Sequence, residues 1–595
     1  MIFNESDGSM NYSKFKFREY DYGWTWGSYF RCYEGIRQTS IFINNIDINE
    51  DLTKEEITDM KGQARFLRAY FYWLLLRKYG PVPIIPEPIA IEETYEGMSA
   101  PRNTYDEVVD YIDKEMLQAA KELPETRDNL NIARPTRGAA LATRAKALLY
   151  SASPLNNPGG PADGDPSETF PDFVDDTGRQ LMSQTYDEAK WAKAAAAAKD
   201  VIDLGVYKLY TASFKSKGDF AYPATVVPPY HPEYSNKNYP DGWANIDPFE
   251  SYRAVFNGDL YAYENPELIF TRGTNQINDG AKDLVRHQMP ANAGGDNNHG
   301  LTIKQVDAYE MADGSTFNYQ TFLDTCDVNE RFVTKEDSIA GKYPQIRPGV
   351  WKEYANREPR FYASVAFNGA VWPFSSARDA AYKNLQTWYY RGDPNGRKNG
   401  TDHWQPTGIG VMKYVSPKDC NTNEGKIYDK VDVPLRYADI ILMFAEAMNE
   451  LTGPHEVTNW KGETYTINRD EEAMSKAVSQ VRIRAGVPDY KKEVYQSQEL
   501  LRERLKHERQ VELLAENQRY FDLRRWKDAP VKEAEQIYGC NVLMTKDKAE
   551  RFYERVRVEN LQTAFSRKMY FWPIHYDELK NNLRMTQAPG WQYYD

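Results

Sequence analysis

The sequence predicts a mainly α protein, in which tetratricopeptide-like helical pairs form a scaffold that carries a large loop-rich face with short strands. Helical periodicity fills both ends of the chain, Ala-rich stretches provide small residues where helices pack, and Pro, Gly, Asn and Asp interrupt the middle. We expect one domain over residues 1–595. It comprises an N-terminal helical scaffold at 29–210, a loop-rich region at 211–432 and a C-terminal helical part at 433–595.

The expected N-terminal helices have start and stop signals. Gln63–Tyr79 places apolar residues at helical spacing and ends at a Gly-Pro pair. Thr104–Glu122 opens with the Thr-x-x-Glu pattern of a capping box. Arg137–Ala152 and Tyr186–Leu204 are rich in Ala, the strongest helix former, and a glycine follows the second. These signals predict successive helices joined by short turns.

The C-terminal part again shows helical periodicity, over Arg436–Glu450, Arg469–Ala485 and Gln498–Glu516. Three carboxylates of the last helix, Glu508, Glu512 and Glu516, share one face. Paired carboxylates are typical of glycoside hydrolases. Arg504 and Arg509 lie within a turn of the same helix, and this favours an ion-paired scaffold face.

Composition and charge disfavour several classes of partner. The formal net charge of −13 opposes binding to nucleic acid or to an anionic membrane surface. The longest apolar run, Tyr70–Leu76, is far shorter than the roughly 20 residues that span a bilayer. The four cysteines have neither disulfide-scaffold nor metal-ligand spacing, so we expect isolated thiols. They are Cys32, Cys326, Cys420 and Cys540.

Motifs of enzyme chemistry and of cofactor binding are absent from the sequence. It contains no G-x-S-x-G, H-E-x-x-H or P-loop pattern, and no glycine-rich dinucleotide loop follows a strand. Asp47–Asp51 begins like a calcium loop but lacks the required Gly and terminal Glu. The acidic loop Asp163–Asp176 leaves a structural calcium ion possible beside the simpler interpretation of a solvated loop. We expect no catalytic residues and no other cofactor.

Several strings occur in the order typical of one family. They include GQARFLRAYFYWLLLRKYGPVPII (Gly62–Ile85), TRGAALATRAKALLYSASPL (Thr136–Leu155), VPLRYADIILMFAEAMNE (Val433–Glu450), ERQVELLAENQRYFDLRRW (Glu508–Trp526) and MYFWPIHYDEL (Met569–Leu579). Over nearly its whole length the chain resembles the SusD/RagB family, the surface glycan-capture lipoproteins of Bacteroidetes.

The resemblance implies a non-catalytic protein that captures oligosaccharide or polysaccharide at the cell surface. It also implies delivery to a SusC-like TonB-dependent outer-membrane transporter, with the loop-rich region facing the ligand. Attachment to the outer membrane is expected through a lipidated cysteine, which together with an export signal we expect to precede Met1. Some relatives handle peptides or glycoprotein glycans, and this alternative stays open. A glycoside hydrolase and an intracellular helical-repeat adaptor that binds peptides are remoter alternatives.

Sugar binding needs an aromatic ring to stack on the apolar face of a pyranose, with amide or charged groups beside it for the hydroxyls. Loop residues that meet this requirement are the candidates for ligand contact. In each case the ring or amide can instead be buried and hold its own loop together. The candidates are Trp24, Trp26, Trp243, Asn297, Asn298, Trp372, Trp388, Tyr389, Tyr390 and Trp404.

Overall fold

A computed structural model describes most of the chain. It covers residues 2–3, 28–85, 99–214, 223, 225–273, 281–398, 403–422, 425–558 and 563–591. Two of the candidate residues, Trp24 and Trp26, lie outside the described residues.

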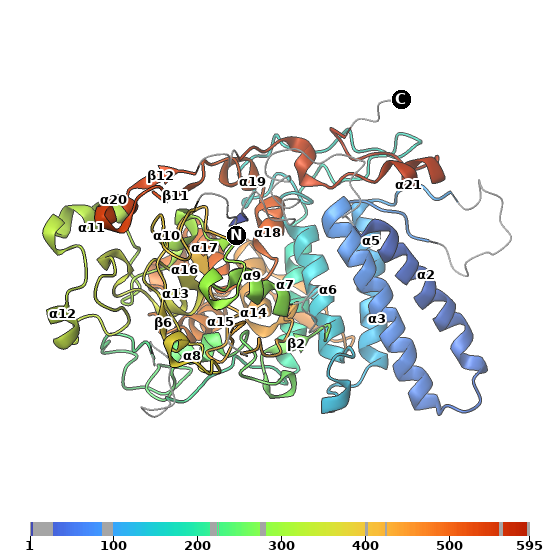
Figure 1. The fold of residues 1–595 in the computed structure, drawn as a ribbon. Helices are drawn as coiled ribbons and strands as arrows, with labels where there is room; N and C mark the ends of the chain where they lie inside the picture. The colour runs from blue at the N-terminus through green and yellow to red at the C-terminus, as the bar shows by residue number, and fades with distance from the viewer. Residues whose placement is uncertain are drawn as a thin grey trace.

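The N-terminal scaffold is a row of helices, each packed on the next. The row consists of α2 (Tyr29–Asn45), α3 (Lys54–Tyr79), α5 (Tyr105–Glu122), α6 (Arg137–Ala152) and α7 (Ala189–Asp203). They lie side by side in Figure 1, and tertiary contacts join each neighbouring pair. The predicted mainly α fold built from helical pairs is confirmed.

Local sequence explains where these helices begin. The Thr104 hydroxyl accepts a hydrogen bond from the Glu107 amide at 3.1 Å, and the Glu107 carboxylate accepts one from the Thr104 amide at 2.8 Å. This is the predicted capping box. α7 starts at Ala189, later than predicted. Just before it, the Asp187 carboxylate accepts from the Ala189 amide at 2.9 Å, and the Asp187 amide donates to the Asn157 side chain at 2.8 Å.

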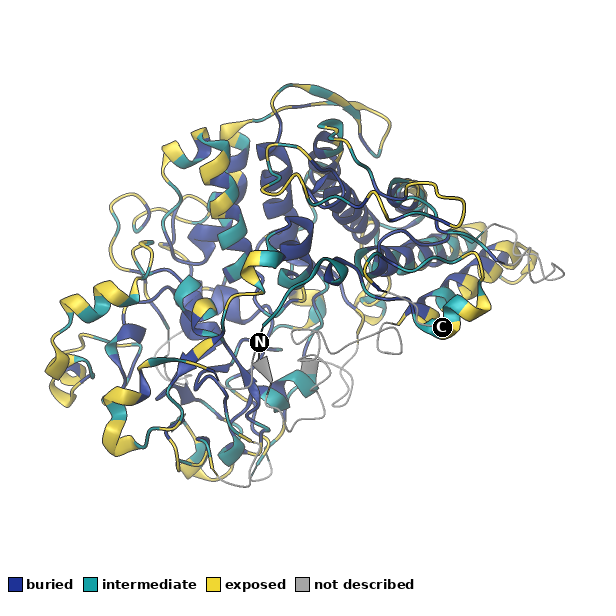
Figure 2. Ribbon diagram, turned by 90° about the horizontal axis from the view of Figure 1, so that it is seen from above, coloured by how far each residue is buried: buried dark blue, intermediate teal, exposed yellow. Residues whose placement is uncertain are grey.

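The loop-rich region has a hydrophobic cluster of its own, which packs around short elements. These include α8 (Pro248–Arg253) and α13 (Pro359–Ser364). An antiparallel sheet of order β1-β3-β7-β4 joins four two-residue strands, which are Ile2–Phe3, His299–Gly300, Gly410–Val411 and Val365–Ala366. The short strands expected in this region are therefore present. Figure 2 shows that buried residues are concentrated in the interior of the helical scaffold and of the loop-rich region. Exposed residues lie on the outer helices and loops.

The C-terminal helices return to the scaffold. α14 (Tyr437–Asn449) packs against α7, α15 (Glu471–Arg484) and α17 (Gln498–Glu512). Beyond them, the segment that contains β11 (Tyr538–Cys540), β12 (Arg555–Arg557) and α21 (Tyr576–Asn581) runs along the upper edge in Figure 1 towards α3. There the Trp572 amide donates to the Lys78 carbonyl at 2.7 Å. This C-terminal segment therefore packs against the N-terminal helices.

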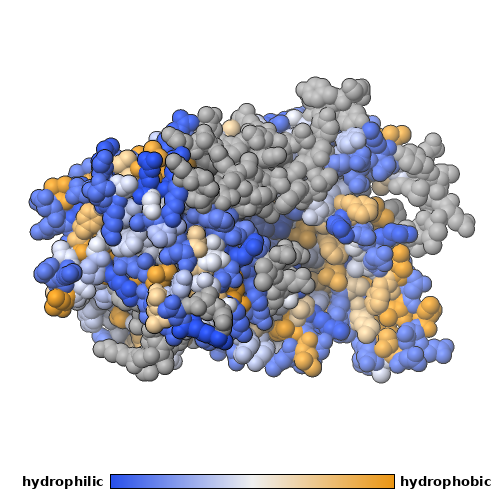
Figure 3. Space-filling view, in the orientation of Figure 1, coloured by the Kyte–Doolittle hydropathy of each residue, from blue (hydrophilic) through white to orange (hydrophobic). Residues whose placement is uncertain are grey.

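The surface is uneven in hydropathy. Apolar side chains gather at the end of the molecule where α2 and α3 lie, whereas the visible face of the loop-rich part is mostly hydrophilic (Figure 3). Exposed apolar residues at that end include Phe30, Ile41, Phe42 and Ile48. In the described part of the chain, no helix combines the length and the apolar character required to cross a membrane.

Candidate functional site

A cavity of about 1260 Å³ lies between the loop-rich region and the C-terminal helices. Its walls come from α9 (Ala281–Gln288), β3, α10 (Ile303–Ala308), α18 (Arg519–Arg525), α19 (Ala529–Lys532) and the β11–β12 pair. The volume exceeds the roughly 300–1,000 Å³ that is usual for small-molecule sites. The cavity therefore has room for a ligand of several units.

The polar part of the lining combines charged side chains with amides and hydroxyls. The amides and threonine hydroxyls are Thr302, Gln305, Gln510, Asn517, Gln518, Gln536 and Thr563. Such groups both donate and accept hydrogen bonds, as sugar hydroxyls require. Leu284 and Ile537 add apolar surface, and Tyr538, which is 47% exposed, offers a ring on the same wall. Polar groups beside an aromatic ring suit a carbohydrate.

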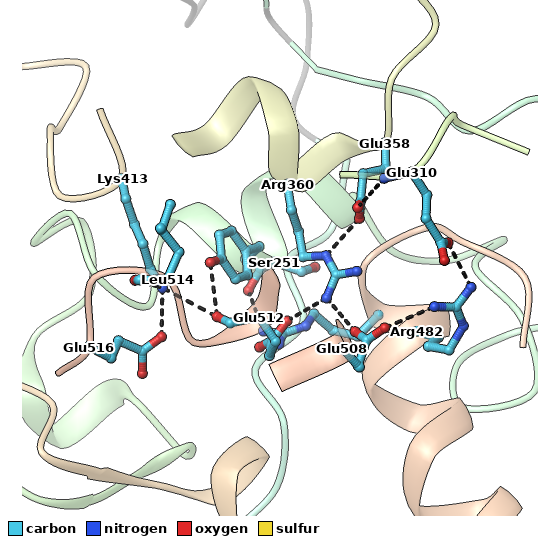
Figure 4. A network of polar contacts seen from close by, with 12 residues as sticks. Ser251, Glu310, Glu358, Arg360, Lys413, Arg482, Glu508, Glu512, Leu514 and Glu516 are labelled. Carbon is cyan, nitrogen blue, oxygen red and sulfur yellow. Dashed lines mark hydrogen bonds and ion pairs between the residues drawn. The ribbon is translucent and has the colours of Figure 1, made fainter. Parts of the chain in front are cut away.

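A buried ion network surrounds Glu508, Glu512 and Glu516 at the end of α17 (Figure 4). Arg360 of α13 contacts Glu508 at 2.5 Å and Glu512 at 2.9 Å. Arg482 of α15 contacts Glu508 at 2.8 Å. Burial raises the pKa of Glu508, but the charges of Arg360 and Arg482 outweigh it and lower that pKa to about 2. These carboxylates are therefore ionised and held in place.

Arg436 extends the network from β8 (Leu435–Arg436). Its guanidinium contacts Glu267 at 2.6 Å, Glu512 at 2.9 Å and Glu516 at 2.6 Å. Arg484 also pairs with Glu512. The predicted ion-paired face is confirmed. Because arginines bind these buried carboxylates, the carboxylates cannot reach a substrate as an acid–base pair.

The partners predicted for that face were wrong. Arg509 instead pairs with Asp439 at 2.7 Å and with Asp522 at 3.0 Å. Arg504 lies over the ring of Tyr490, 5.8 Å from its centroid. Helical spacing identified the shared face of the carboxylates, but the cations that bind it come from elements distant in sequence.

Lys413 connects this network to the cavity wall. Its ammonium group donates to the Glu516 carboxylate at 2.6 Å and to the Leu514 carbonyl at 2.8 Å. Burial lowers the pKa of Lys413 to about 8. These bonds fix a turn after α17, in which Ala515 and Asn517 both have φ of 60°, a strained region for residues other than glycine. α17 ends at Glu512 rather than at the predicted Glu516, and the turn lines the cavity.

Six of the candidate residues have buried side chains. They are Trp243, Asn297, Asn298, Trp372, Tyr389 and Tyr390. The Trp372 indole donates to the Thr387 hydroxyl at 3.0 Å, and the Asn297 amide donates to the Asn395 and His403 carbonyls, each at 3.0 Å. In this structure these side chains are buried and hold loops together, which is the alternative that the sequence left open for each of them.

Trp388 and Trp404 are partly exposed. The Trp388 ring stacks on Tyr390, with centroids 5.7 Å apart, and lies beneath the Lys546 ammonium at 5.2 Å. The Arg397 guanidinium lies 5.1 Å from the Trp404 ring. Neither tryptophan lines the cavity. A ligand contact at these two rings therefore stays a prediction.

The cavity residues were not among the sequence candidates. Asn517, Gln518 and Arg519 stand in the Glu508–Trp526 string that carries the family resemblance. The run of polar residues directly after the carboxylate-rich helix was the available signal. It contains no aromatic ring on a long loop, the feature expected of a sugar-binding residue.

Carboxylates of the acidic loop Asp163–Asp176 pair with lysine and arginine side chains of the protein. Asp163 pairs with Lys527 at 2.8 Å, Asp172 with Arg567 at 2.6 Å and Asp176 with Arg584 at 2.8 Å. Among the described residues, no group of three or more His, Cys, Asp or Glu side chains is arranged to hold a metal ion. A structural calcium ion stays a prediction. All four cysteines are free thiols, and Cys326 alone among them is not buried.

Comparison with known proteins places the chain in a family. Residues 266–591, more than half of the chain, match the SusD family, and residues 4–149 match a family described as starch-binding and associating with the outer membrane. A SusD-like protein of Formosa agariphila is 30% identical over 69 residues, a match that spans 12% of each protein.

Solved structures show the same fold over the whole chain. BT4246 superposes with a TM-score of 0.78 at 24% identity, covering 98% of this chain and 93% of that one. A SusD-like protein from Bacteroides fragilis gives 0.63 at 22% identity, with coverage of 94% and 85%. Surface glycan-binding protein A from Bacteroides uniformis gives 0.51 at 16% identity, with coverage of 99% and 91%. This chain belongs to the SusD family.

Proposed function

We propose that this protein captures oligosaccharide or polysaccharide in the cavity beside α18 and releases it unaltered. The observation that carries the proposal is the lining, in which amide and hydroxyl groups lie beside Tyr538 and apolar side chains in a space of about 1260 Å³. Burying a sugar hydroxyl without a hydrogen-bond partner is unfavourable. A wall rich in groups that donate and accept therefore suits a ligand with many hydroxyls.

Family membership supports the same function. The N-terminal match is to starch-binding proteins that associate with the outer membrane, and one structural neighbour is named as a surface glycan-binding protein. We further propose delivery of the glycan to a SusC-like TonB-dependent transporter. Attachment to the cell surface is through a lipid anchor on the outer membrane.

Affinity electrophoresis and calorimetry against a glycan panel test the proposal. We expect micromolar to millimolar binding of at least one glycan, without release of reducing sugar. Tyr538→Ala should weaken that binding because the ring is exposed on the cavity wall. Tyr261→Ala, an exposed tyrosine outside the cavity lining, is the matched control. Equal affinities for both variants and the wild type would place the site elsewhere.

Two other functions lead to different results in the same assays. Binding of peptides or glycoprotein glycans, but of no free polysaccharide, would support the alternative ligand class for the same kind of importer. Release of reducing ends would support a glycoside hydrolase. Against the latter, Glu508 and Glu512 are buried in arginine pairs.

A further inference from the structure

We propose that the cavity selects anionic glycans, and that Arg519 binds their carboxylate or sulfate groups. This inference rests on the proposed function and specifies the class of glycan.

Arg519 is a cation in the lining without a paired anion. It forms no ion pair and no hydrogen bond with any described residue, and its Nη1 atom is buried. Its guanidinium carbon lies 5.9 Å from the centroid of the Trp526 ring. An unpaired guanidinium in a partly buried site is unfavourable unless a ligand or water binds it.

Carboxylates near Arg519 are bound to other cations. Glu533 accepts two hydrogen bonds from Arg524, at 2.8 and 3.1 Å. Asp522 is held by Arg509 and Arg525, and Asp528 pairs with Lys506 at 3.0 Å. These pairs leave Arg519 as the cation that is free to bind an incoming anion.

Two lysines add positive charge to the same wall. Lys304 and Lys532 both line the cavity, and they share one carboxylate, Glu535, which Lys304 contacts closely and Lys532 approaches at 3.7 Å. Burial and the charges of Lys532 and Arg519 lower the pKa of Lys304 despite the opposing effect of Glu535. The lining also holds Arg555 and the carboxylates Asp283, Asp307 and Glu533, so cations and carboxylates balance in number, and Arg519 differs from the other cations in having no ion-pair partner among the described residues.

The unpaired state of Arg519 and the shape of its guanidinium indicate the ligand chemistry. A planar guanidinium matches two oxygens of a carboxylate, and it also binds the oxygens of a sulfate ester. The amide groups nearby, Asn517, Gln518 and Gln536, suit the hydroxyls of the same sugar units. Uronic acids and sulfated sugars both combine these features, so the shared requirement is a hydroxyl-rich polymer with negative charge.

Glycans that share a polysaccharide backbone but differ in charge separate the contribution of charge to binding from that of the sugar chain. We would measure binding to polygalacturonate and to its carboxyl-reduced form, to alginate, and to dextran sulfate and dextran, with a polyglutamate peptide as the peptide probe. The variants are Arg519→Gln, Arg519→Lys and, as a charge-matched control, Arg31→Gln on α2, whose side chain is 82% exposed. Thermal unfolding by circular dichroism verifies that each variant is folded.

We expect an acidic probe to bind at least ten times more tightly than its neutral counterpart. Arg519→Gln should weaken that binding by about 10- to 100-fold, the range of a lost hydrogen bond to a charged group. Arg519→Lys should retain part of it and Arg31→Gln all of it. Binding should weaken as salt is raised. Preference for polygalacturonate identifies a carboxylate ligand, and preference for dextran sulfate identifies a sulfated one.

Other outcomes overturn the inference. Equal affinity for the charged and the neutral glycan of each pair contradicts the role of Arg519. An unchanged affinity of Arg519→Gln for the acidic glycans contradicts it as well. Binding of neutral glycans alone contradicts it while leaving the proposed function intact. Arg519-dependent binding of polyglutamate without any glycan makes the ligand a peptide, and no binding to any probe counts against both proposals.

Discussion

Arg436 binds both the side chain and the backbone of Glu512. Its Nη1 lies 2.9 Å from the carboxylate and its Nη2 lies 2.9 Å from the carbonyl oxygen. The two side chains are 1% and 0% exposed. One guanidinium therefore fixes the end of α17 to β8, and the turn that lines the cavity starts from that point.

Removing this guanidinium should strongly destabilise the fold. In Arg436→Met a side chain of similar length leaves Glu267, Glu512 and Glu516 with fewer counter-charges in a buried space. Breaking a buried pair from one side costs about 3–5 kcal/mol. We expect a loss of this size in the free energy of unfolding, measured by urea denaturation.

The exposed Arg31 provides the control for this change. Arg31→Met should alter stability by no more than about 0.5 kcal/mol. An equally small effect of Arg436→Met would show that the network can be replaced by apolar packing.

Glu353 should make stability depend on pH. Burial raises the pKa of its carboxyl from 4.5 to about 7, against the lowering effect of Arg555. The folded protein thus retains a proton that the unfolded chain releases. The associated stabilisation is complete below about pH 4.5 and is lost as the pH rises through about 7. Glu353→Gln stays neutral, so its stability relative to the wild type should rise by about 3 kcal/mol from pH 4 to 8.

Melting curves across this pH range measure the effect. Glu554→Gln, at a side chain that is 49% exposed, is the matched control and should show no such trend. A constant difference between Glu353→Gln and the wild type at all pH values would mean that Glu353 ionises normally.

Trp388 and Trp404 provide a comparison between two possible binding surfaces. Because neither ring lines the cavity, Trp388→Ala and Trp404→Ala should retain glycan affinity within about twofold, whereas Tyr538→Ala should not. Trp388→Ala should also lower stability by about 2 kcal/mol, since its ring packs on Tyr390. Titration calorimetry distinguishes the sites. A large loss of affinity in Trp404→Ala, with stability unchanged, would place the ligand on the outer loops.

The capping box of α5 should contribute measurably to stability. Thr104→Ala removes the hydroxyl that accepts from the Glu107 amide, and this kind of loss costs about 1 kcal/mol. Thr58→Ala is the control, because the Thr58 hydroxyl bonds to the Lys54 carbonyl within α3 and caps no terminus. Thermal unfolding of the two variants should differ by about 1 °C, because the entropy of unfolding of a chain of 595 residues is large. Equal melting temperatures would show that tertiary packing alone fixes the start of α5.

Local signals determined much of the fold. The α6 boundaries agree with the prediction at both ends, Arg137 and Ala152, because Ala-rich periodicity and flanking turns act within a few residues. The end of α17 was misplaced, since the Leu514 carbonyl after it binds the side chain of Lys413, which is distant in sequence. Boundaries set by local bonding were predictable, and those set by tertiary hydrogen bonds were not.

By itself, the sequence determined the mainly α class and the shared face of Glu508, Glu512 and Glu516. It also determined the family, through motifs that occur in a fixed order along the chain. Each of these depends on spacing along one chain. The tertiary structure alone decided that Trp372 is buried, that Arg436 and Arg360 neutralise α17, and that Arg519 lines a cavity without a carboxylate partner among the described residues. Burial and ion pairing depend on which distant segments meet, and periodicity carries no information about that.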